Sequence, residues 1–503
     1  MLGQKSEILS VVCQNRTKLR RLAAGVCASA ILPLVGCTSL DAVTTGLEVT
    51  PSNRPVTAEN VRSGRLAAIG AQQHPKILAA YGGEYANVKL ERMVAGIVGK
   101  LVTVSDNPSQ VYQISILDSP VINAFALPGG YLYVSRGLLA LANDSSELAA
   151  VIAHEMAHVT AEHGVKRQRK EAEAELASRV VTEVLADKSA GRRALARGKV
   201  ALAQFSRNQE LEADAIGIAA LFEAGFDAYS AARFQETMDA FSRLSSGGDV
   251  GDNSLDFLAT HPSTPQRIAL ALGHARKFGP RGQGEVGREA YLAGLEGMLF
   301  GDSPNEGFVR GNSYAHVGLG IAIDFPEGFK VENRPEAVLA AGEDGAAVRF
   351  DGAEVPADQS LTDYLASGWV EGLDRASVRP LILNGIEAAN ARALVDRWAF
   401  DITVLRVEGS VYRILTAVPA VGVDLDALSR QTREGFRILS PQEKAQIQPL
   451  RVRIARAQSD DSVRTLSANM AGFDDRQSAF RVFNGMAADE EVKAGELYKF
   501  VTQ

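Results

Sequence analysis

The chain has 503 residues, of which 46% are hydrophobic and 22% charged, and its formal net charge is −7. This length allows roughly two to four domains, and the composition excludes a disordered chain. The acidic balance argues against a nucleic-acid-binding surface. Its three cysteines all lie within the first 37 residues, which excludes a disulfide framework and a cysteine-based zinc site in the rest of the chain.

Residues 1–36 are predicted to be a secretory signal. The first part carries five basic residues and one acidic residue, and an apolar run follows from Leu22 to Val35. That run is shorter than the about 20 residues that a helix needs to span a bilayer. A basic segment followed by a short apolar core is typical of a signal peptide, with a buried N-terminal helix as the alternative.

The end of this segment, Leu34–Cys37, resembles a bacterial lipobox. The resemblance implies cleavage before Cys37 and acylation of that residue, and a multi-acyl anchor holds a protein firmly on a membrane. Because Thr38 follows rather than an acidic residue, the sorting rule of enteric bacteria implies the inner face of the outer membrane. We therefore expect a periplasmic lipoprotein, with residues 37–57 as its tether.

Residues 58–275 are predicted to form a mostly helical domain. One of its helices carries His154 and His158, four residues apart and therefore on one face, one turn along. Both imidazoles can reach one zinc ion at about 2.0–2.1 Å. Glu155 lies about 100° round the helix. There it can contact a water molecule as a general base without binding the metal.

The third metal ligand has to come from elsewhere in the chain. The metzincin pattern requires glycine at position 161 and histidine at position 164, whereas this chain has Ala161 and Gly164. His163 falls one residue short. On a continuing helix it points away from the direction of His158, so we do not expect it to reach the same ion.

A glutamate on a second helix is the other solution, and the segment 206–214 contains one. Glu210 and Asp214 are four residues apart on one face, with Glu212 on the opposite side. Glu210 could bind the metal while Asp214 orients a ligand histidine through its second ring nitrogen. The alternative is an ordinary solvated acidic helix face.

Four stretches together resemble a family of gluzincin peptidases that contains the type I CAAX prenyl protease, HtpX, BepA and LoiP. They are Asn123–Tyr131, His154–His158, Ser206–Asp214 and Thr260–Ile268. The resemblance covers residues 58–275. It implies one Zn²⁺ per chain, held by His154, His158 and Glu210. It also implies that Glu155 is the base and that Asp214 supports a ligand.

His261, within the last of these stretches, has two functional interpretations. It could stabilise the oxyanion of the tetrahedral intermediate. It could also bind zinc as a fourth ligand and hold the enzyme latent, as the resemblance to BepA implies. A structural histidine at the entry of a helix, before Pro262, is the third interpretation.

The segment that matches the family ahead of the metal-binding helix is expected to bind substrate through Asn123, Gly129, Gly130 and Tyr131. The two glycines allow a tight turn into an extended strand at 131–134. An exposed edge on this strand could pair with the backbone of a peptide substrate. An ordinary hairpin strand is the alternative.

The remainder of the chain is expected to hold a linker and two further domains. Residues 276–313 are rich in glycine and are predicted to be the linker. Residues 314–440 are predicted to form an α+β domain on an antiparallel sheet, of unknown role. Residues 449–503 resemble a degenerate LysM module with the order βααβ, which implies binding to N-acetylglucosamine-containing glycans such as peptidoglycan; the insert 472–475 departs from that pattern.

The sequence thus predicts a multidomain α+β protein. We expect a lipid-anchored periplasmic zinc metalloendopeptidase whose substrates are proteins or peptides. Its family and its address suggest quality control of misfolded or unassembled envelope and outer-membrane proteins. The alternative is a non-enzymatic envelope scaffold or chaperone with a latent zinc site.

Overall fold

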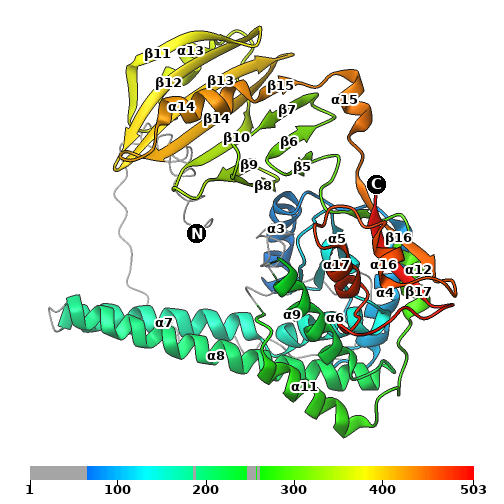
Figure 1. Cartoon of the computed structure of the whole chain (residues 1–503). Coiled ribbons are helices and arrows are strands. Elements are labelled where there is room, and N and C mark those ends of the chain that lie inside the picture. The colour runs from blue at the N-terminus through cyan, green and yellow to red at the C-terminus, as the bar shows by residue number, and fades with distance from the viewer. Residues whose placement is uncertain (1–64, 128, 185–187, 246–256, 258–260) are drawn as a thin grey trace.

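The computed structural model describes residues 65–503 except 128, 185–187, 246–256 and 258–260. The predicted signal, the tether and Cys37 lie outside the described residues. The prediction of a multidomain α+β chain is confirmed, because helices and several antiparallel sheets are present (Figure 1). No helix among the described residues is long and apolar enough to cross a membrane.

The first domain is mostly helical, with one small sheet beside its helices (Figure 1). Buried apolar residues of α4 and α6 pack together in its main core. The helices are α3 (Arg65–Ala80), α4 (Val88–Thr103), α5 (Arg136–Leu141), α6 (Ser145–Thr160), α7 (His163–Val184), α8 (Lys188–Glu223), α9 (Ser230–Leu244) and α11 (Pro265–Phe278). The strands are β1 (Gln113–Leu117), β2 (Ala124–Leu127) and β3 (Tyr131–Ser135).

The sheet differs from expectation in which strand has a free edge. β3 was expected to expose an edge, but it is the central strand, parallel to β1 and antiparallel to β2, and all five of its residues are buried. The two edge strands of this sheet are β1 and β2, and β2 packs against α6. Gly129 and Gly130 form the tight turn between β2 and β3, with φ of 91° and 80°.

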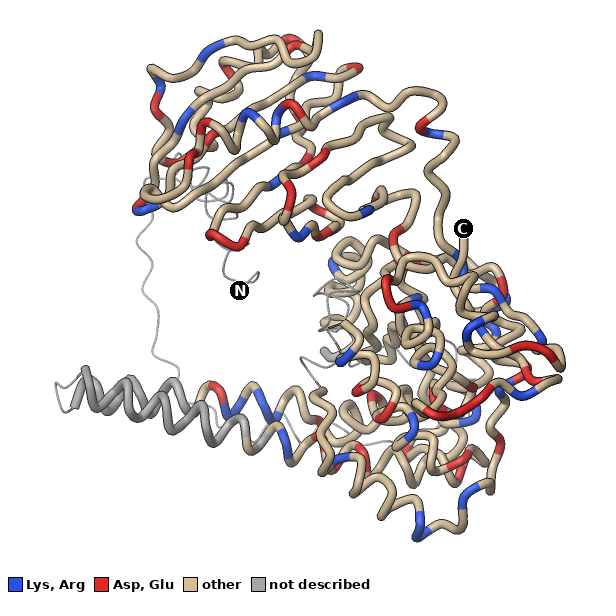
Figure 2. The backbone as a smooth tube through the Cα atoms, viewed as in Figure 1, with Lys and Arg blue, Asp and Glu red and all other residues tan. Residues whose placement is uncertain are grey.

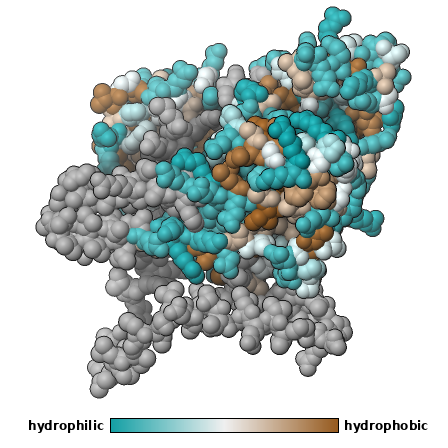
Figure 3. All heavy atoms as spheres, turned by 90° about the horizontal axis from the view of Figure 1, so that it is seen from below, coloured by the Kyte–Doolittle hydropathy of each residue, from teal (hydrophilic) through white to brown (hydrophobic). Residues whose placement is uncertain are grey.

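α7 and α8 form a long antiparallel hairpin that extends away from the rest of the domain (Figure 1). The described part of α7 is highly charged (Figure 2), with ion pairs one turn apart between Arg167 and Glu171 and between Lys170 and Glu173. On the face of the molecule that carries α8 and α11, apolar side chains are scattered among polar ones (Figure 3). Among the described residues of α8 and α11, the large exposed hydrophobic side chains are Ile216, Phe222 and Leu270.

The C-terminal segment has the element order that the sequence predicts. It consists of β16 (Leu450–Arg456), α16 (Val463–Ser467), α17 (Arg476–Phe483) and β17 (Leu497–Thr502). Its buried residues belong to the same hydrophobic core as those of the first domain. Phe483 of α17 meets Phe241 of α9 edge to face, and buried Lys499 donates hydrogen bonds to two carbonyls at the end of α5.

The predicted linker also contributes to this shared core. Within it, α12 (Arg288–Leu295) buries Tyr291, Leu292 and Leu295 completely. The short strand β4 (Leu299–Phe300) pairs with β16. Glycine-rich turns surround these elements, and their composition predicts a linker. In the structure, however, α12 within this segment packs into the shared core.

Residues 308–438, which include most of the predicted domain 314–440, contain two sheets built mainly on antiparallel strands (Figure 1). A four-stranded sheet and α14 (Leu425–Glu434) cover one face of a seven-stranded sheet, while α13 (Leu361–Ala366) covers the other. The large sheet has the order β11 (Leu373–Leu383), β12 (Ile386–Val395), β13 (Trp398–Val407), β14 (Ser410–Pro419), β10 (Ala347–Ala353), β9 (Ala337–Ala341) and β8 (Lys330–Arg334). The small sheet has the order β15 (Phe436–Ile438), β7 (Ile321–Asp324), β6 (Ser313–His316) and β5 (Phe308–Arg310). The helix α15 (Pro441–Gln446) leads on to β16.

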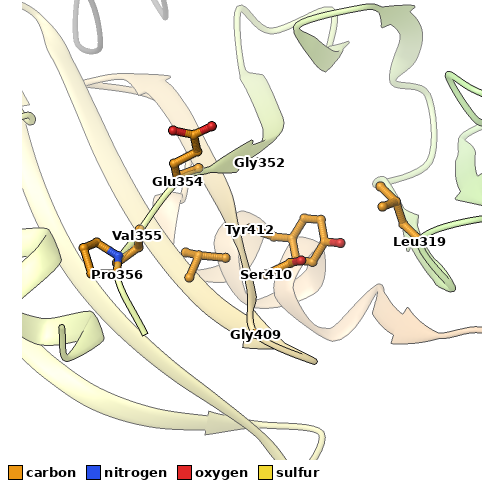
Figure 4. Close-up of a pocket in the computed structure, with 10 residues that line it drawn as sticks. Leu319, Gly352, Glu354, Val355, Pro356, Gly409, Ser410 and Tyr412 are labelled. Carbon is orange, nitrogen blue, oxygen red and sulfur yellow. The ribbon is translucent and has the colours of Figure 1, made fainter. Parts of the chain in front are cut away.

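A surface hollow of about 780 Å³ lies on this second domain (Figure 4). Val355 and Pro356 line one end, and Tyr412 and Leu319 line the other. It is open and partly apolar, and its lining residues come only from the second domain. It is therefore separate from the histidine cluster described next.

Candidate metal centre

Helix α6 carries His154 and His158, the two histidines of an HExxH motif (His154–His158), and its N-terminus is capped. The Asp144 side chain accepts a hydrogen bond from the backbone N–H of Glu147 at 2.8 Å, which is the contact of an N-terminal helix cap. Glu147 reaches back to the backbone N–H of Asn143 at 2.9 Å. Burial, together with the charge of Asp144, raises the pKa of Glu147 to about 7, although Arg233 opposes the shift. The N-terminus of α6 is thus fixed inside the core.

The two histidines lie on one face of α6, as their spacing requires. Their Nε2 atoms are 3.0 Å apart, and their ring centroids are 4.6 Å apart in an edge arrangement. His154 is almost fully buried, and His158 is half-buried. Both rings therefore present a nitrogen atom to the same small volume.

Glu210 reaches that volume from α8. One carboxylate oxygen is 3.4 Å from Nε2 of His154, and the other is 3.4 Å from Nε2 of His158. The close approach of the two helices depends on Gly217, because a Cβ atom there would lie 3.2 Å from the backbone nitrogen of His154. Glu210 is therefore not part of a solvated helix face; it is a buried partner of both histidines.

His261 joins the group from the segment that precedes α11. Its Nδ1 atom is 3.0 Å from Oε2 of Glu210 and 3.3 Å from Nε2 of His154. In this group of His154, His158, Glu210 and His261, one donor atom per residue can be chosen so that all four lie within 4.8 Å of one another. The structure thus brings together all three predicted ligands and the residue whose role the sequence left open.

The spacing of these four atoms fits a tetrahedral metal ion. Ligands at 2.0–2.1 Å from zinc lie about 3.3 Å apart at the corners of a tetrahedron. The distances from His154 to His158 and to His261, and from Glu210 to each of the three histidines, run from 3.0 to 3.4 Å, with Oε1 of Glu210 facing His158 and Oε2 facing His154 and His261. Three imidazole nitrogens and one carboxylate oxygen are also a donor set that zinc accepts.

Glu155 lies beside this cluster without joining it. It is 4% exposed, and its Oε1 atom is 3.6 Å from Nε2 of His261. Among the described residues that oxygen has no hydrogen-bond partner. Burial raises the pKa of Glu155, although the positive charges of His261 and His154 oppose the shift. Such a carboxylate is ready to accept a proton.

Asp214 and Arg267 form a buried support around the ligands. Oδ1 of Asp214 is 3.0 Å from Nδ1 of His154, the ring nitrogen that faces away from the cluster. Arg267 donates to both oxygens of Asp214 at 2.8 Å and contacts Glu210 at 3.0 Å. Burial by itself would raise the pKa of Asp214, but hydrogen bonds from Arg267 and His154 outweigh it and hold that pKa well below its usual value.

Arg267 lies in the stretch Thr260–Ile268 that resembles the family, but the sequence alone predicts no role for it. The short distance along the chain between His261 and Arg267, which is near the start of α11, is the feature that could have placed this arginine close to the site. Only the fold shows that this arginine reaches across to α8.

The expected substrate-binding residues lie at the small sheet rather than in the cluster. Asn123 is buried; its amide nitrogen donates to the Tyr81 hydroxyl at 2.9 Å, and its backbone N–H donates to the Ser135 side chain. Gly130 has to be glycine, because a Cβ atom there would lie 2.2 Å from the carbonyl oxygen of Val111. Tyr131 is 6% exposed, in the central strand. Their role in substrate binding stays a prediction.

A buried HExxH helix joined to a distant glutamate defines a metal centre of the gluzincin class. In agreement with this, residues 87–275 match the model of Peptidase family M48. This part of the chain is therefore similar to the M48 peptidases in sequence as well as in the arrangement of these side chains.

Curated relatives match part of the chain. The mitochondrial metalloendopeptidase OMA1 of Schizosaccharomyces pombe is 34% identical over 177 residues, which cover 35% of this chain and 50% of that protein. The putative beta-barrel assembly-enhancing protease of Vibrio cholerae is 31% identical over 200 residues, covering 38% of this chain and 40% of that protein. The beta-barrel assembly-enhancing protease of Escherichia coli is 30% identical over 190 residues, with 36% and 38% covered. The matched region spans half or less of the length of each relative.

Proposed function

We propose that this chain is a zinc metalloendopeptidase with one metal ion per chain, held by His154, His158 and Glu210. The observation that carries the proposal is the approach of Glu210 to both histidines at 3.4 Å and of their two Nε2 atoms to each other at 3.0 Å, close to the about 3.3 Å between the ligands of a tetrahedral zinc ion. The names of the relatives, a metalloendopeptidase and a protease, support the same reaction class.

The residues around the ion divide the chemistry between them. His154, His158 and Glu210 would hold the zinc ion, which when bound would polarise the carbonyl of the scissile peptide and lower the pKa of a water molecule to about 7. Glu155 accepts the proton of the attacking water through its unpartnered oxygen and passes it to the leaving amine. Asp214 holds the ring of His154 from behind, so that its Nε2 atom stays directed at the ion. The peptide bond breaks without a covalent link to the chain.

His261 determines whether this site is open. With four donors around one point, a tetrahedral ion has no position left for water. We therefore favour the latent form for the arrangement in this structure, with His261 as a fourth ligand that has to leave before cleavage. As a fourth ligand His261 blocks cleavage, so His261→Ala should accelerate cleavage. If His261 instead stabilises the oxyanion, the same change should slow cleavage. The closed site is also the observation that favours the alternative function, a scaffold or chaperone with a latent zinc site.

The edge of β2 is the surface proposed to bind the substrate backbone. β2 packs against α6 and has no strand on its other side within the described sheet. An extended peptide that added a strand there would run beside the metal-binding helix. This replaces the edge of β3 that the sequence suggested, and it leaves Asn123, Gly129 and Gly130 the role of holding β2 in place.

The cellular setting rests on the N-terminus and on the relatives. We propose a lipid anchor on Cys37, attachment to the inner face of the outer membrane, and substrates among misfolded or unassembled envelope proteins. Metabolic labelling with palmitate and membrane fractionation of wild type and Cys37→Ser test the anchor. Binding of 449–503 to peptidoglycan also stays a proposal, and a full chain that is not retained on purified sacculi would reject it.

The test of the reaction compares zinc content and cleavage in the full-length protein. Glu155→Gln should keep the metal and lose cleavage of casein, whereas Glu210→Ala should lose both, because Glu210 contacts both histidines. Chelation should abolish wild-type cleavage, and added zinc should restore it. Cleavage by Glu155→Gln at the wild-type rate would refute the role of Glu155. Zinc bound without any chelator-sensitive cleavage would favour the scaffold.

A further inference from the structure

His163 lies directly behind one of the metal-binding histidines. The sequence excluded it as a ligand by extending α6 past residue 160, but the helix ends at Thr160. The chain then turns through Glu162, which has φ of 53°, and α7 begins at His163. A residue with a Cβ atom rarely adopts this left-handed conformation. The turn brings His163 back towards His158.

The contact between the two rings involves the nitrogen of His158 that faces away from the metal centre. Nδ1 of His163 is 2.8 Å from Nδ1 of His158, and the ring centroids are 4.8 Å apart. His163 is 3% exposed, so this hydrogen bond is shielded from water. Because His163 approaches Nδ1 while Nε2 of His158 faces Glu210, His163 is placed to support that ligand and not to replace it.

The same geometry specifies where the protons lie. To bind a metal through Nε2, His158 has to carry its proton on Nδ1 and donate it to Nδ1 of His163. The proton of His163 then sits on Nε2, which is 3.3 Å from a carboxylate oxygen of Glu212. A chain of two hydrogen bonds therefore runs from Glu212 through His163 to His158, with every donor facing an acceptor.

His163 is itself held from α8, beside the third ligand. The side-chain amide of Gln209 donates to the backbone carbonyl of His163 at 2.9 Å. Gln209 is buried and immediately precedes Glu210. The start of α7 is thereby fixed to the part of α8 that supplies the carboxylate.

The two ligands on α6 are supported in parallel ways. His154 has the buried carboxylate of Asp214 behind its Nδ1 atom at 3.0 Å, and His158 has His163 in the same position. Partners of this kind fix the tautomer and the orientation of a ligand ring, and their loss typically costs about 10- to 100-fold in metal affinity or activity. The Glu212 side chain is 53% exposed, so its own contribution is screened by solvent.

We propose that His163 is a positioning residue that fixes the tautomer and the ring orientation of His158 for metal binding, with Glu212 fixing the tautomer of His163. This inference rests on the proposed function, because it takes His158 to be a zinc ligand. It gives a role to a histidine that is not part of the ligand group.

The experiment measures zinc affinity of the full-length protein by competition with a chromophoric chelator, and the absorption spectrum of the cobalt-substituted protein. His163→Phe keeps a ring of similar size but cannot accept a hydrogen bond, so we expect zinc affinity to fall about 10- to 100-fold and the cobalt bands to change. His163→Asn offers an oxygen near the position of Nδ1 and should recover most of the lost affinity. Glu212→Gln should lower affinity less than His163→Phe. His274→Phe, on α11, is the matched control and should bind like wild type.

Each outcome separates this inference from the proposal on which it rests. If the wild-type protein binds no zinc, or if its zinc affinity is no higher than that of His154→Ala, the proposed metal centre is wrong. If wild type binds zinc and folded His163→Phe binds it equally, only the role of His163 is overturned. If His163→Phe does not fold, the test is made with folded His163→Asn. A zinc affinity of His163→Asn as low as that of His154→Ala would then refute support by hydrogen bonding.

Discussion

Removal of the Arg267 guanidinium should destabilise the metal-free protein and impair metal binding. Arg267→Met keeps an apolar chain but removes four contacts: two at 2.8 Å to Asp214, one at 3.0 Å to Glu210 and one at 3.1 Å to the carbonyl of Pro262. The side chains involved are only 6–8% exposed, so solvent cannot replace the lost charge. Breaking a buried pair by removing one partner typically costs about 3–5 kcal/mol.

The assay is urea unfolding followed by circular dichroism, with and without zinc, together with zinc content after dialysis. We expect a lower unfolding midpoint for metal-free Arg267→Met and a smaller difference when zinc is present, because a bound cation also compensates Glu210. Arg276→Met, an exposed position on the same helix, is the control and should change stability little. A metal-free Arg267→Met that unfolds at the same urea concentration as wild type would show that the two carboxylates do not need this arginine.

Three further predictions test other parts of the structure. Phe483→Ala should lower the unfolding free energy of the peptidase domain by about 3–5 kcal/mol, because this side chain packs against Phe241 in the shared core; unchanged thermal unfolding and cleavage would contradict a shared core. Gly130→Ala should destabilise the fold by more than about 1 kcal/mol, since φ is 80° and the carbonyl of Val111 blocks the Cβ position, and a thermal melt equal to wild type would refute this. Because burial and Asp144 raise the pKa of Glu147 to about 7, its contribution to stability is fully present below about pH 4.5 and is lost as pH rises towards 7; Glu147→Gln should flatten that part of the pH profile of unfolding, and an unaltered profile would argue against the raised pKa.

The sequence was sufficient to predict the local part of the centre. The period of an α-helix places His154 and His158 on one face, one turn apart. The same periodicity paired Glu210 with Asp214 on one side of α8 and put Glu212 on the other. These are relations within one turn or two of a helix, which the order of residues specifies directly.

Relations between distant segments were beyond such reasoning. The contact of Arg267 with Glu210 depends on how α11 packs against α8. The central position of β3 arises from its parallel pairing with β1, which no hairpin pattern signals. The position of His163 was missed because a left-handed turn at Glu162 has no glycine to mark it. Glycine-rich turns likewise concealed the buried helix α12.

The hydrophobic core shared by α6, α9, α12 and α17 also determines when the peptidase domain can be completed during synthesis. Its residues come from two stretches of sequence, 90–298 and 450–501, with the whole antiparallel domain between them. The ribosome has to make the intervening sheets before β16, α17 and β17 exist to close the core. The metal-binding helix therefore acquires its complete packing only after the second stretch has been made.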